Sequence, residues 1–356
     1  MSSSNISSAS PRPVSSQESS SVPVSSSFRV VILGGGEAGL TALDALSHTS
    51  LTPHLALIEP SAYHYDQPAW MRVGTGGLKK ERTRSREDLQ VPTDVTWYQQ
   101  QATRIDPDAS TVTLADGTRI GYDYLLVALG TETHWDRIRH LEEHLGRHGI
   151  CSAYGYEQAE RTWEMLHSFE GGRALFTAPS TPFKGGDAPL QILRRAEAVW
   201  SETGVRDRTE LYFTTAAHPD LAGAPYAELM KREAARDDIH VYTGYELVDV
   251  RPEKHEAVFG VTKGNSQSEA VLPYDLLHVV PPMRPPALLE ESGLAHRDGP
   301  LKGYMEIAAD TFRHKRFGTV FGIGDAIGVE GVKTGERARR QAQAVAEMLQ
   351  RLAGDE

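Results

Sequence analysis

The feature that most constrains this chain is a glycine-rich turn that directly follows a run of hydrophobic residues near the N-terminus. Residues 28–33 have the composition of a buried β-strand, and Gly34, Gly36 and Gly39 then match the spacing G-x-G-x-x-G. In nucleotide-binding βαβ units the first glycine permits a tight turn, the second admits a pyrophosphate, and the third lets helix and strand pack closely. The sequence therefore predicts a helix over residues 38–47 whose positive N-terminus is directed at phosphates.

An acidic residue follows the next predicted strand. Residues 55–58 are hydrophobic and lead into Glu59, close to the spacing expected for an acid that binds a ribose 2′-hydroxyl group. The alternative is a glycine turn with an ordinary surface glutamate. Because strand, turn, helix, strand and acid occur in the required order, the pattern favours a dinucleotide-binding unit.

Composition and charge exclude several classes of protein. The 356 residues are enough for about two domains, and the net charge of -11 argues against a nucleic-acid partner. No uninterrupted apolar run approaches the roughly 20 residues of a membrane-spanning helix, so we expect no stable membrane insertion and a cytoplasmic location. Cys151 is the only cysteine, which excludes an intramolecular disulfide and a cysteine-based metal cluster. No spacing of His, Asp and Glu suggests another metal site.

The chain divides into a tail and two α/β units. Residues 1–27 are dominated by serine and carry few large apolar side chains, so we expect a disordered tail. Residues 28–150 alternate predicted strands and helices, and residues 151–285 form a second unit of the same kind. Residues 286–356 return to the first unit and end in a predicted helix.

The second unit lacks a nucleotide fingerprint. A predicted strand at residues 173–177 opens it in the right place, but residues 178–189 contain three prolines and no G-x-G-x-x-G. Because proline has no backbone N–H group, this loop has fewer donors for a pyrophosphate. We therefore expect no nicotinamide cofactor to bind here in the usual way.

Longer motifs resemble the sulfide:quinone oxidoreductase family and extend over nearly the whole chain from Arg29 onwards. The matching segments read VILGGG, IEPS, HYDQPAW, YLLVALG, TPFK, LHVVPPM and VFGIGD, and they begin at Val31, Ile58, His64, Tyr124, Thr181, Leu277 and Val320. The resemblance implies an α/β fold of two Rossmann-like domains, with glutathione-reductase-like flavoprotein architecture, and FAD as the cofactor. The residues that it implies for FAD binding are Gly34, Gly36, Gly39, Glu59, Gln67, Pro68, Ala128, Gly130, Asp325, Lys333 and Thr334.

The chain departs from the family at the residues that carry its sulfur chemistry. Family members oxidise sulfide with two cysteines beside the flavin, and the corresponding positions here are Gly185 and Ala326. Neither residue can supply the thiolate that a persulfide requires. Cys151 aligns with neither position, and we interpret it as an inert, partly buried residue.

A second departure concerns the C-terminal end. The family continues with amphipathic helices that hold the membrane and frame a quinone tunnel, whereas this sequence ends at Glu356. The predicted last helix, residues 336–352, has the periodicity of a helix packed on a core, with one face formed by Ala338, Ala342, Val345, Leu349 and Leu352. We interpret its basic residues as a solvated face rather than a membrane-binding patch: Arg337, Arg339 and Arg340.

Four residues are candidates for contact with a substrate: Lys184, Tyr154, Glu132 and His134. Lys184 stands beside a vacated cysteine position and could orient an anionic substrate, and Tyr154 could line the same cavity. Glu132 and His134 could act as acid or base near the flavin, although a pair on a surface loop explains them equally well.

Lys333 and Thr334 begin the last predicted helix. There they would stabilise negative charge at the N1/O2 edge of the reduced flavin, because a helix N-terminus and a lysine are both positive. The alternative is a simple helix start, and the alignment with the family favours the flavin role.

Three hypotheses follow for the function. The first is an FAD-dependent oxidoreductase without cysteine chemistry, in which hydride passes directly between a small organic substrate and flavin N5, with dioxygen or a quinone as electron acceptor. The second is oxidation of sulfide or a thiol without protein cysteines, with a quinone as acceptor. The third is a flavin-binding protein without turnover. A homo-oligomer is compatible with all three.

Overall fold

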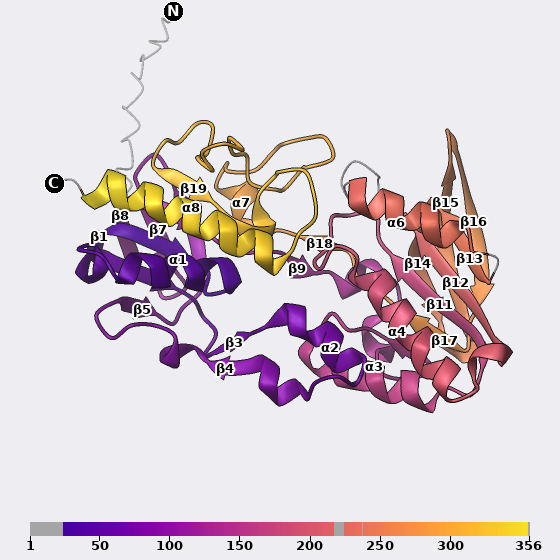
Figure 1. Ribbon diagram of the computed structural model, residues 1–356. Coiled ribbons are helices and arrows are strands. Elements are labelled where there is room, and N and C mark those ends of the chain that lie inside the picture. Colours follow the sequence, from indigo (N-terminus) through magenta and orange to yellow (C-terminus); the bar gives the residue numbers. More distant parts are fainter. Residues whose placement is uncertain (1–23, 217–223, 237, 355–356) are drawn as a thin grey trace, which may run out of the picture.

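The computed structural model describes residues 24–216, 224–236 and 238–354, which form two α/β units (Figure 1). Most of the predicted disordered tail lies outside the described residues. The end of that tail differs from the prediction, because Ser26 and Ser27 belong to strand β1 (Ser26–Leu33) and pair with Ile120 and Gly121. Strands pair through backbone groups that every residue except proline carries, so a serine-rich composition does not prevent this extension.

The first unit is built on a mixed sheet with β1 near its centre. In the described part of the chain it has seven strands in the order β5-β2-β1-β8-β7-β6, with β19 paired to β8. β1 runs parallel to both of its neighbours, and β19 runs parallel to β8, whereas β6, β7 and β8 form an antiparallel meander. The other strands of this sheet are β2 (Leu55–Ile58), β5 (Thr96–Tyr98), β6 (Ala102–Asp106), β7 (Thr111–Leu114), β8 (Arg119–Val127) and β19 (Val320–Gly322).

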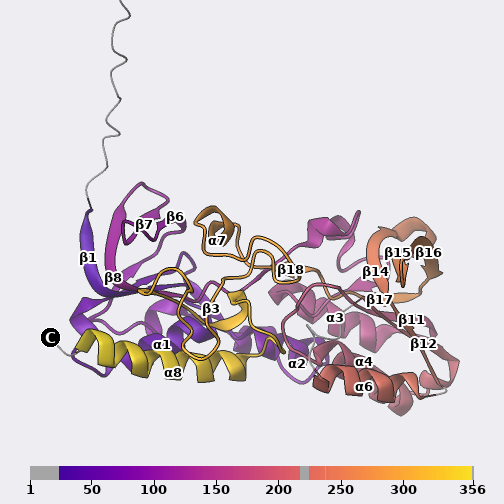
Figure 2. The same ribbon diagram turned by 90° about the horizontal axis from the view of Figure 1, so that it is seen from above.

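Helices α1 (Glu37–Ser47) and α8 (Gly335–Gly354) pack against each other on one face of this sheet (Figure 2). The predicted core face of α8 is confirmed except at its end, where Leu352 is 37% exposed and Ala353 is 3% exposed. The prediction for Leu352 was wrong because the buried stripe continues four residues after Leu349, at Ala353, rather than three.

The second unit has a parallel sheet covered on both faces. The order of its strands is β10-β17-β11-β12-β13, with α3, α4 and α6 on one side and the antiparallel sheet β14-β15-β16 on the other (Figures 1 and 2). The bounds of the parallel strands are β10 (Ile150–Cys151), β11 (Gly172–Ala178), β12 (Thr209–Thr215), β13 (Ile239–Thr243) and β17 (Leu276–His278). Those of the covering elements are α3 (Tyr156–Ser168), α4 (Ala188–Glu202), α6 (Ala224–Ala234), β14 (Tyr245–Arg251), β15 (Glu256–Lys263) and β16 (Ser266–Pro273).

Short elements join the two units. Strand β9 (Glu132–Thr133) leaves the first unit and pairs with β18 (Met283–Arg284), on which the chain returns. The remaining short helices and strands are β3 (Tyr63–Tyr65), η2 (Gln67–Ala69), α2 (Trp70–Gly74), β4 (Arg84–Arg86), η4 (Glu87–Leu89), α7 (Leu288–Glu291) and η9 (Gly324–Ala326). Single turns of 3-10 helix complete the fold: η1 (Thr52–His54), η3 (Lys80–Thr83), η5 (Trp135–Arg137), η6 (Glu142–His144), η7 (Arg206–Arg208) and η8 (Pro252–Lys254).

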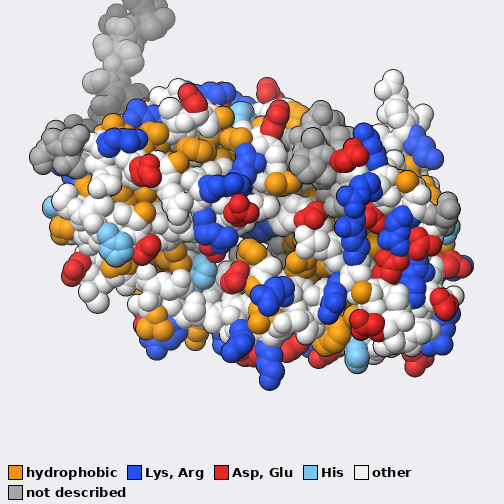
Figure 3. Space-filling view, viewed as in Figure 1, with side chains coloured by type: hydrophobic (Ala, Val, Ile, Leu, Met, Phe, Trp, Pro, Cys, Tyr) orange, Lys and Arg blue, Asp and Glu red, His pale blue; other side chains and the backbone are white. Residues whose placement is uncertain are grey.

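The surface carries charges of both signs. On the face seen in Figure 3, basic and acidic side chains are interspersed over both units. Within the residues that the structure describes, no helix combines the length and the apolar character needed to cross a bilayer.

The packing of α1 on β1 makes Gly39 a sensitive position. A Cβ atom added there would lie 1.9 Å from the Gly34 carbonyl oxygen, so the helix would have to move away from the strand. We expect Gly39→Ala to lower the free energy of unfolding by about 3 kcal/mol, the upper range for overpacking, as measured by urea denaturation. Gly318→Ala is the matched control, because its Cβ atom meets nothing within 4 Å. Equal stabilities of the two variants would contradict the close packing.

Candidate functional site

The glycine turn after β1 leaves its backbone open to a ligand. Gly34 has φ +106, which favours glycine, and its added Cβ atom would lie 2.6 Å from the Ala128 carbonyl oxygen. A Cβ atom on Gly36 would meet nothing within 4 Å, and no side chain caps α1 there. The three glycines thus have the geometry that their spacing predicted, with free space in front of the helix N-terminus.

Glu59 is fixed against this turn at the end of β2. Its carboxylate accepts hydrogen bonds from the backbone N–H groups of Gly35 and Ser61, both at 2.7 Å. A carboxylate has about four lone-pair sites, so two acceptor positions remain for other donors such as ribose hydroxyl groups.

Glu87 is a buried acid beside Glu59 that sequence analysis missed. It lies in η4 with no exposed surface, and neither carboxyl oxygen has a hydrogen-bond partner among the described residues. Burial, and to a smaller extent the charge of Glu59, raises the pKa of Glu87 to about 8. Its neighbours Arg86 and Asp88 pair with each other on the surface, so the sequence gives no signal for its burial.

The turn after β8 and the segment after β19 lie at the same edge of the sheet as the glycine turn. Gly130 has φ +66, and its added Cβ atom would meet nothing within 4 Å. Gly324 in η9 lies against the first turn of α1, since its added Cβ atom would be 3.3 Å from the Cβ atom of Ala38. The half-buried Asp325 is thereby placed near the N-terminus of α1.

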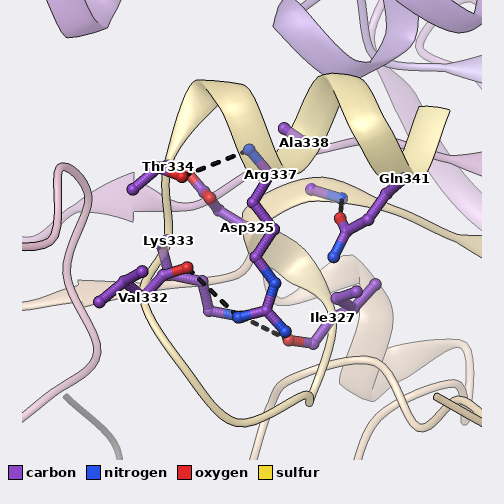
Figure 4. A pocket seen from close by; sticks show the side chains of 9 residues that line it. Asp325, Ile327, Val332, Lys333, Thr334, Arg337, Ala338 and Gln341 are labelled. Atoms are coloured by element: carbon purple, nitrogen blue, oxygen red, sulfur yellow. Dashed lines mark hydrogen bonds between the residues drawn. The ribbon is translucent and has the colours of Figure 1, made fainter. Parts of the chain in front are cut away.

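A small pocket between η9 and the start of α8 is lined by Asp325, Lys333, Thr334 and Arg337 among others (Figure 4). Lys333 is 6% exposed, and its Nζ donates a hydrogen bond of 2.6 Å to the Ile327 carbonyl group. Burial lowers the pKa of Lys333 to about 8, while Asp325 raises it and Arg337 lowers it further.

Arg337 corrects one prediction about α8. The sequence predicted a solvated face for it together with Arg339 and Arg340, but it is half-buried and lines this pocket. Its Nη1 donates to the Val332 carbonyl group at 3.3 Å, and it forms no ion pair with any residue that the structure describes. The reason is that Arg337 lies in the first turn of α8, next to the segment that contains Lys333 and Thr334.

The predicted residues of the two units meet at Lys184. Its Nζ donates to Oε1 of Gln67 at 2.8 Å, and the next N–H group, that of Gly185, donates to the Lys333 carbonyl oxygen at 2.8 Å. Tyr154 donates its hydroxyl proton to the Lys184 carbonyl group at 3.2 Å. The segments that contain Gln67, Tyr154, Lys184 and Lys333 thus come together from four distant parts of the sequence.

The two vacated cysteine positions differ in their surroundings. Gly185 has φ +90, and its added Cβ atom would lie 2.9 Å from that of Ala188, so a side chain there would be strained. Ala326 is fully buried in η9. The two positions where the family resemblance implies cysteines are therefore occupied here by a glycine in the left-handed region and by a small buried alanine.

The acids and bases near Lys184 divide into two groups. Burial lowers the pKa of Lys184, and the charges of Asp325 and Glu132 oppose this shift. His134 instead contacts Asp136 on its own loop, with Nδ1 at 3.5 Å from Oδ1. The charge of Glu132 therefore acts on Lys184, whereas the contact of His134 agrees with its surface-loop alternative.

Pro68 and Thr334 both lie beside Gly335, the first residue of α8. The Cβ atom of an alanine at Gly335 would be 3.2 Å from Cγ of Pro68, and Thr334 caps α8 by accepting a hydrogen bond from the Arg337 N–H group at 3.3 Å.

No group of three or more His, Cys, Asp or Glu side chains with metal-binding geometry occurs among the described residues.

The burial of Cys151 leads to a prediction about thiol chemistry. The side chain is 1% exposed in β10, and burial raises the pKa of its thiol to about 12. We expect a maleimide to leave the native protein unmodified and to label one thiol after denaturation, as measured by mass spectrometry. Rapid labelling of the native protein would contradict this assignment and would make Cys151 a candidate for catalysis.

Comparisons with known proteins agree with this geometry. Residues 28–161 match the family model "Pyridine nucleotide-disulphide oxidoreductase". The chain is 33% identical over 316 residues to the mitochondrial sulfide:quinone oxidoreductase of Dictyostelium discoideum, and the matched part covers 88% of this chain and 68% of the relative. It is 34% identical over 317 residues to the Mus musculus protein, covering 88% and 69%.

The fold is also that of a solved member of this family. The sulfide:quinone oxidoreductase of Aquifex aeolicus superposes with a TM-score of 0.73 at 21% identity, over 92% of this chain and 78% of that structure. The two α/β units therefore have the predicted two-domain architecture of dinucleotide-binding flavoproteins. On these similarities the chain belongs to the sulfide:quinone oxidoreductase family and is an FAD-dependent oxidoreductase.

Proposed function

We propose that this protein binds FAD and transfers hydride directly between flavin N5 and a small organic substrate, without a protein thiol. The observation that carries the proposal is the combination of an open cofactor-binding turn with the replacement of both sulfur positions. Gly185 and Ala326 cannot form a persulfide, and the thiol of Cys151 is buried in the second unit. We also propose that the second domain extends from residue 151 to residue 285.

The residues at the sheet edge fit the cofactor. The open backbone at Gly36 and the N-terminus of α1 suit a pyrophosphate, and Glu59 retains acceptor positions for ribose. When bound, FAD supplies two-electron redox chemistry at its N5 atom. The residues that we propose to hold it are Gly34, Gly36, Gly39, Glu59, Gln67, Pro68, Ala128, Gly130, Asp325, Lys333 and Thr334.

Lys184 is our proposed substrate-binding residue. Its Nζ donates to Oε1 of Gln67 at 2.8 Å, and the charges of Asp325 and Glu132 favour its protonated form. Lys184 is the residue directly before Gly185, the position where the family resemblance implies a cysteine. The lysine ammonium group favours a substrate with a carboxylate or another anionic group, and Glu132 would exchange a proton with it.

Sulfide or a thiol is the second candidate substrate, and one observation favours it. The backbone segments of Lys184 and Lys333 pair with each other, joined by the hydrogen bond between the Gly185 N–H group and the Lys333 carbonyl group, so two lysines belong to this part of the site. They would attract a small anion such as hydrosulfide even without cysteines. The electron acceptor would then be a quinone, as the names of the relatives state for those proteins, whereas the first candidate is equally compatible with dioxygen.

The visible spectrum of the purified protein separates these candidates. We expect a flavin absorption band that added sulfide leaves unchanged under anaerobic conditions, because no thiolate is available to receive the sulfur. Dithionite is the control that shows the flavin can be reduced. Bleaching by sulfide would support the second candidate, and a protein purified without flavin would contradict both.

Lys333 should set the redox potential of the flavin. Its buried charge would stabilise the negative charge of the reduced cofactor, so we expect Lys333→Met to lower the two-electron midpoint potential by at least ~30 mV, a tenfold change in equilibrium. The measurement is reduction in the presence of a reference dye. Lys254→Met is the control, since Lys254 is exposed in η8. An unchanged potential in Lys333→Met would place the flavin ring elsewhere.

A further inference from the structure

We propose that Glu87 is a positioning residue for the adenosine end of FAD, and that it acts through Glu59 to make cofactor retention depend on pH. This inference rests on the proposed binding of FAD at the glycine turn. It starts from a carboxyl group whose two oxygens have no partner among the described residues and whose exposed fraction is zero. Burying a carboxyl group without a hydrogen-bond partner costs free energy, and the cost is greater when the group is charged.

Three side chains surround one face of Gly35. A Cβ atom at Gly35 would lie 2.3 Å from Oε1 of Glu87 and 2.6 Å from Cγ of Glu59, so both acids lie directly beside this glycine. The ring Nδ1 of His64 is 3.2 Å from the Gly35 carbonyl oxygen. The glycine turn and Glu59, which we assign to pyrophosphate and ribose, are therefore in contact with Glu87.

The backbone holds Glu87 in this position. Its N–H group donates to the Ala62 carbonyl group at 3.0 Å, and its own carbonyl oxygen accepts hydrogen bonds from Gln90 and Val91 at 2.8 and 3.2 Å. These bonds fix the backbone from which the side chain extends to the glycine turn. Because the side chain has no exposed surface, it acts on the cofactor through Glu59 and the turn rather than by direct contact.

The charges that face Glu87 favour its protonated form. Glu59 is the acid beside it, and no Lys or Arg side chain forms an ion pair with Glu87 among the described residues. His64 is the other titratable group at Gly35. Ionisation of Glu87, which has no exposed surface, would place a second negative charge beside Glu59, and the repulsion pushes Glu59 and the turn apart.

Binding of FAD strengthens this dependence. The pyrophosphate would bring negative charge to the same turn, which raises the affinity of Glu87 for its proton. By linkage, loss of that proton must then weaken FAD binding. Burial already raises the pKa of Glu87 from 4.5 to about 8, so the folded protein holds this proton at pH 7 and loses it as the pH rises through about 8.

The test is the rate at which the holoenzyme releases FAD, followed by the increase in flavin fluorescence from pH 6.5 to 9.5. We expect release by the unmodified protein to accelerate about tenfold between pH 7 and 9. In Glu87→Gln, which keeps the shape and cannot ionise, release should stay slow and vary less than about twofold. Asp88→Asn is the matched control, because Asp88 pairs with Arg86 on the surface, and it should behave as the unmodified protein does.

The same pH profile in Glu87→Gln and in the unmodified protein would overturn the proposal. If Glu87→Gln does not fold, infrared spectroscopy of the unmodified holoenzyme decides: we expect a protonated carboxyl band at pH 7 that disappears only above pH 8, and its absence at pH 7 overturns the proposal. A protein that binds no flavin contradicts the proposed function. Bound flavin whose release is independent of pH contradicts only the role of Glu87.

Discussion

The parallel pairing of β19 with β8 is the contact on which the candidate site depends. Val320 and Gly322 pair with Leu125 and Val127, and the ladder continues when the Ile323 N–H group donates to the Val127 carbonyl oxygen at 3.0 Å. Because β8 is also the parallel neighbour of β1, the turns after β1, β8 and β19 open at one edge of the sheet. The C-terminal part of the chain thus adds Asp325 and the start of α8 to a nucleotide-binding turn formed far earlier.

The second unit completes the site through a loop that has no nucleotide fingerprint. The segment after β11 carries Lys184 and Gly185, and its backbone pairs with Lys333 rather than with a phosphate. In the same loop, the Ser180 N–H group donates to the Glu246 carboxylate at 2.7 Å, so an acid of the chain itself occupies one donor. In place of a second G-x-G-x-x-G turn, this loop therefore brings a lysine and a backbone that is already paired within the described chain.

The sequence predicted the parts of the molecule that depend on local pattern. The strand, glycine turn and helix from β1 to α1, and the core stripe of α8 up to Leu349, follow from periodicity and glycine spacing. The environments of Glu87 in η4 and of Arg337 at the start of α8 were not predictable, because a charged residue has the same local pattern on a surface as in a pocket. Only tertiary packing distinguishes the two cases.

The site residues that depart from the family resemblance and those that agree with it have different physical roles. Thiol chemistry needs a specific atom, which neither Gly185 nor Ala326 carries. Electrostatic stabilisation needs only charge in a site of low dielectric constant, and Lys184 and Lys333 supply such charge under the influence of Asp325. Both lysines have lowered pKa values because burial opposes their charge. Such a site is better suited to bind and polarise an anionic substrate than to attack one, and this is the physical reason for which we propose direct hydride transfer rather than a covalent sulfur intermediate.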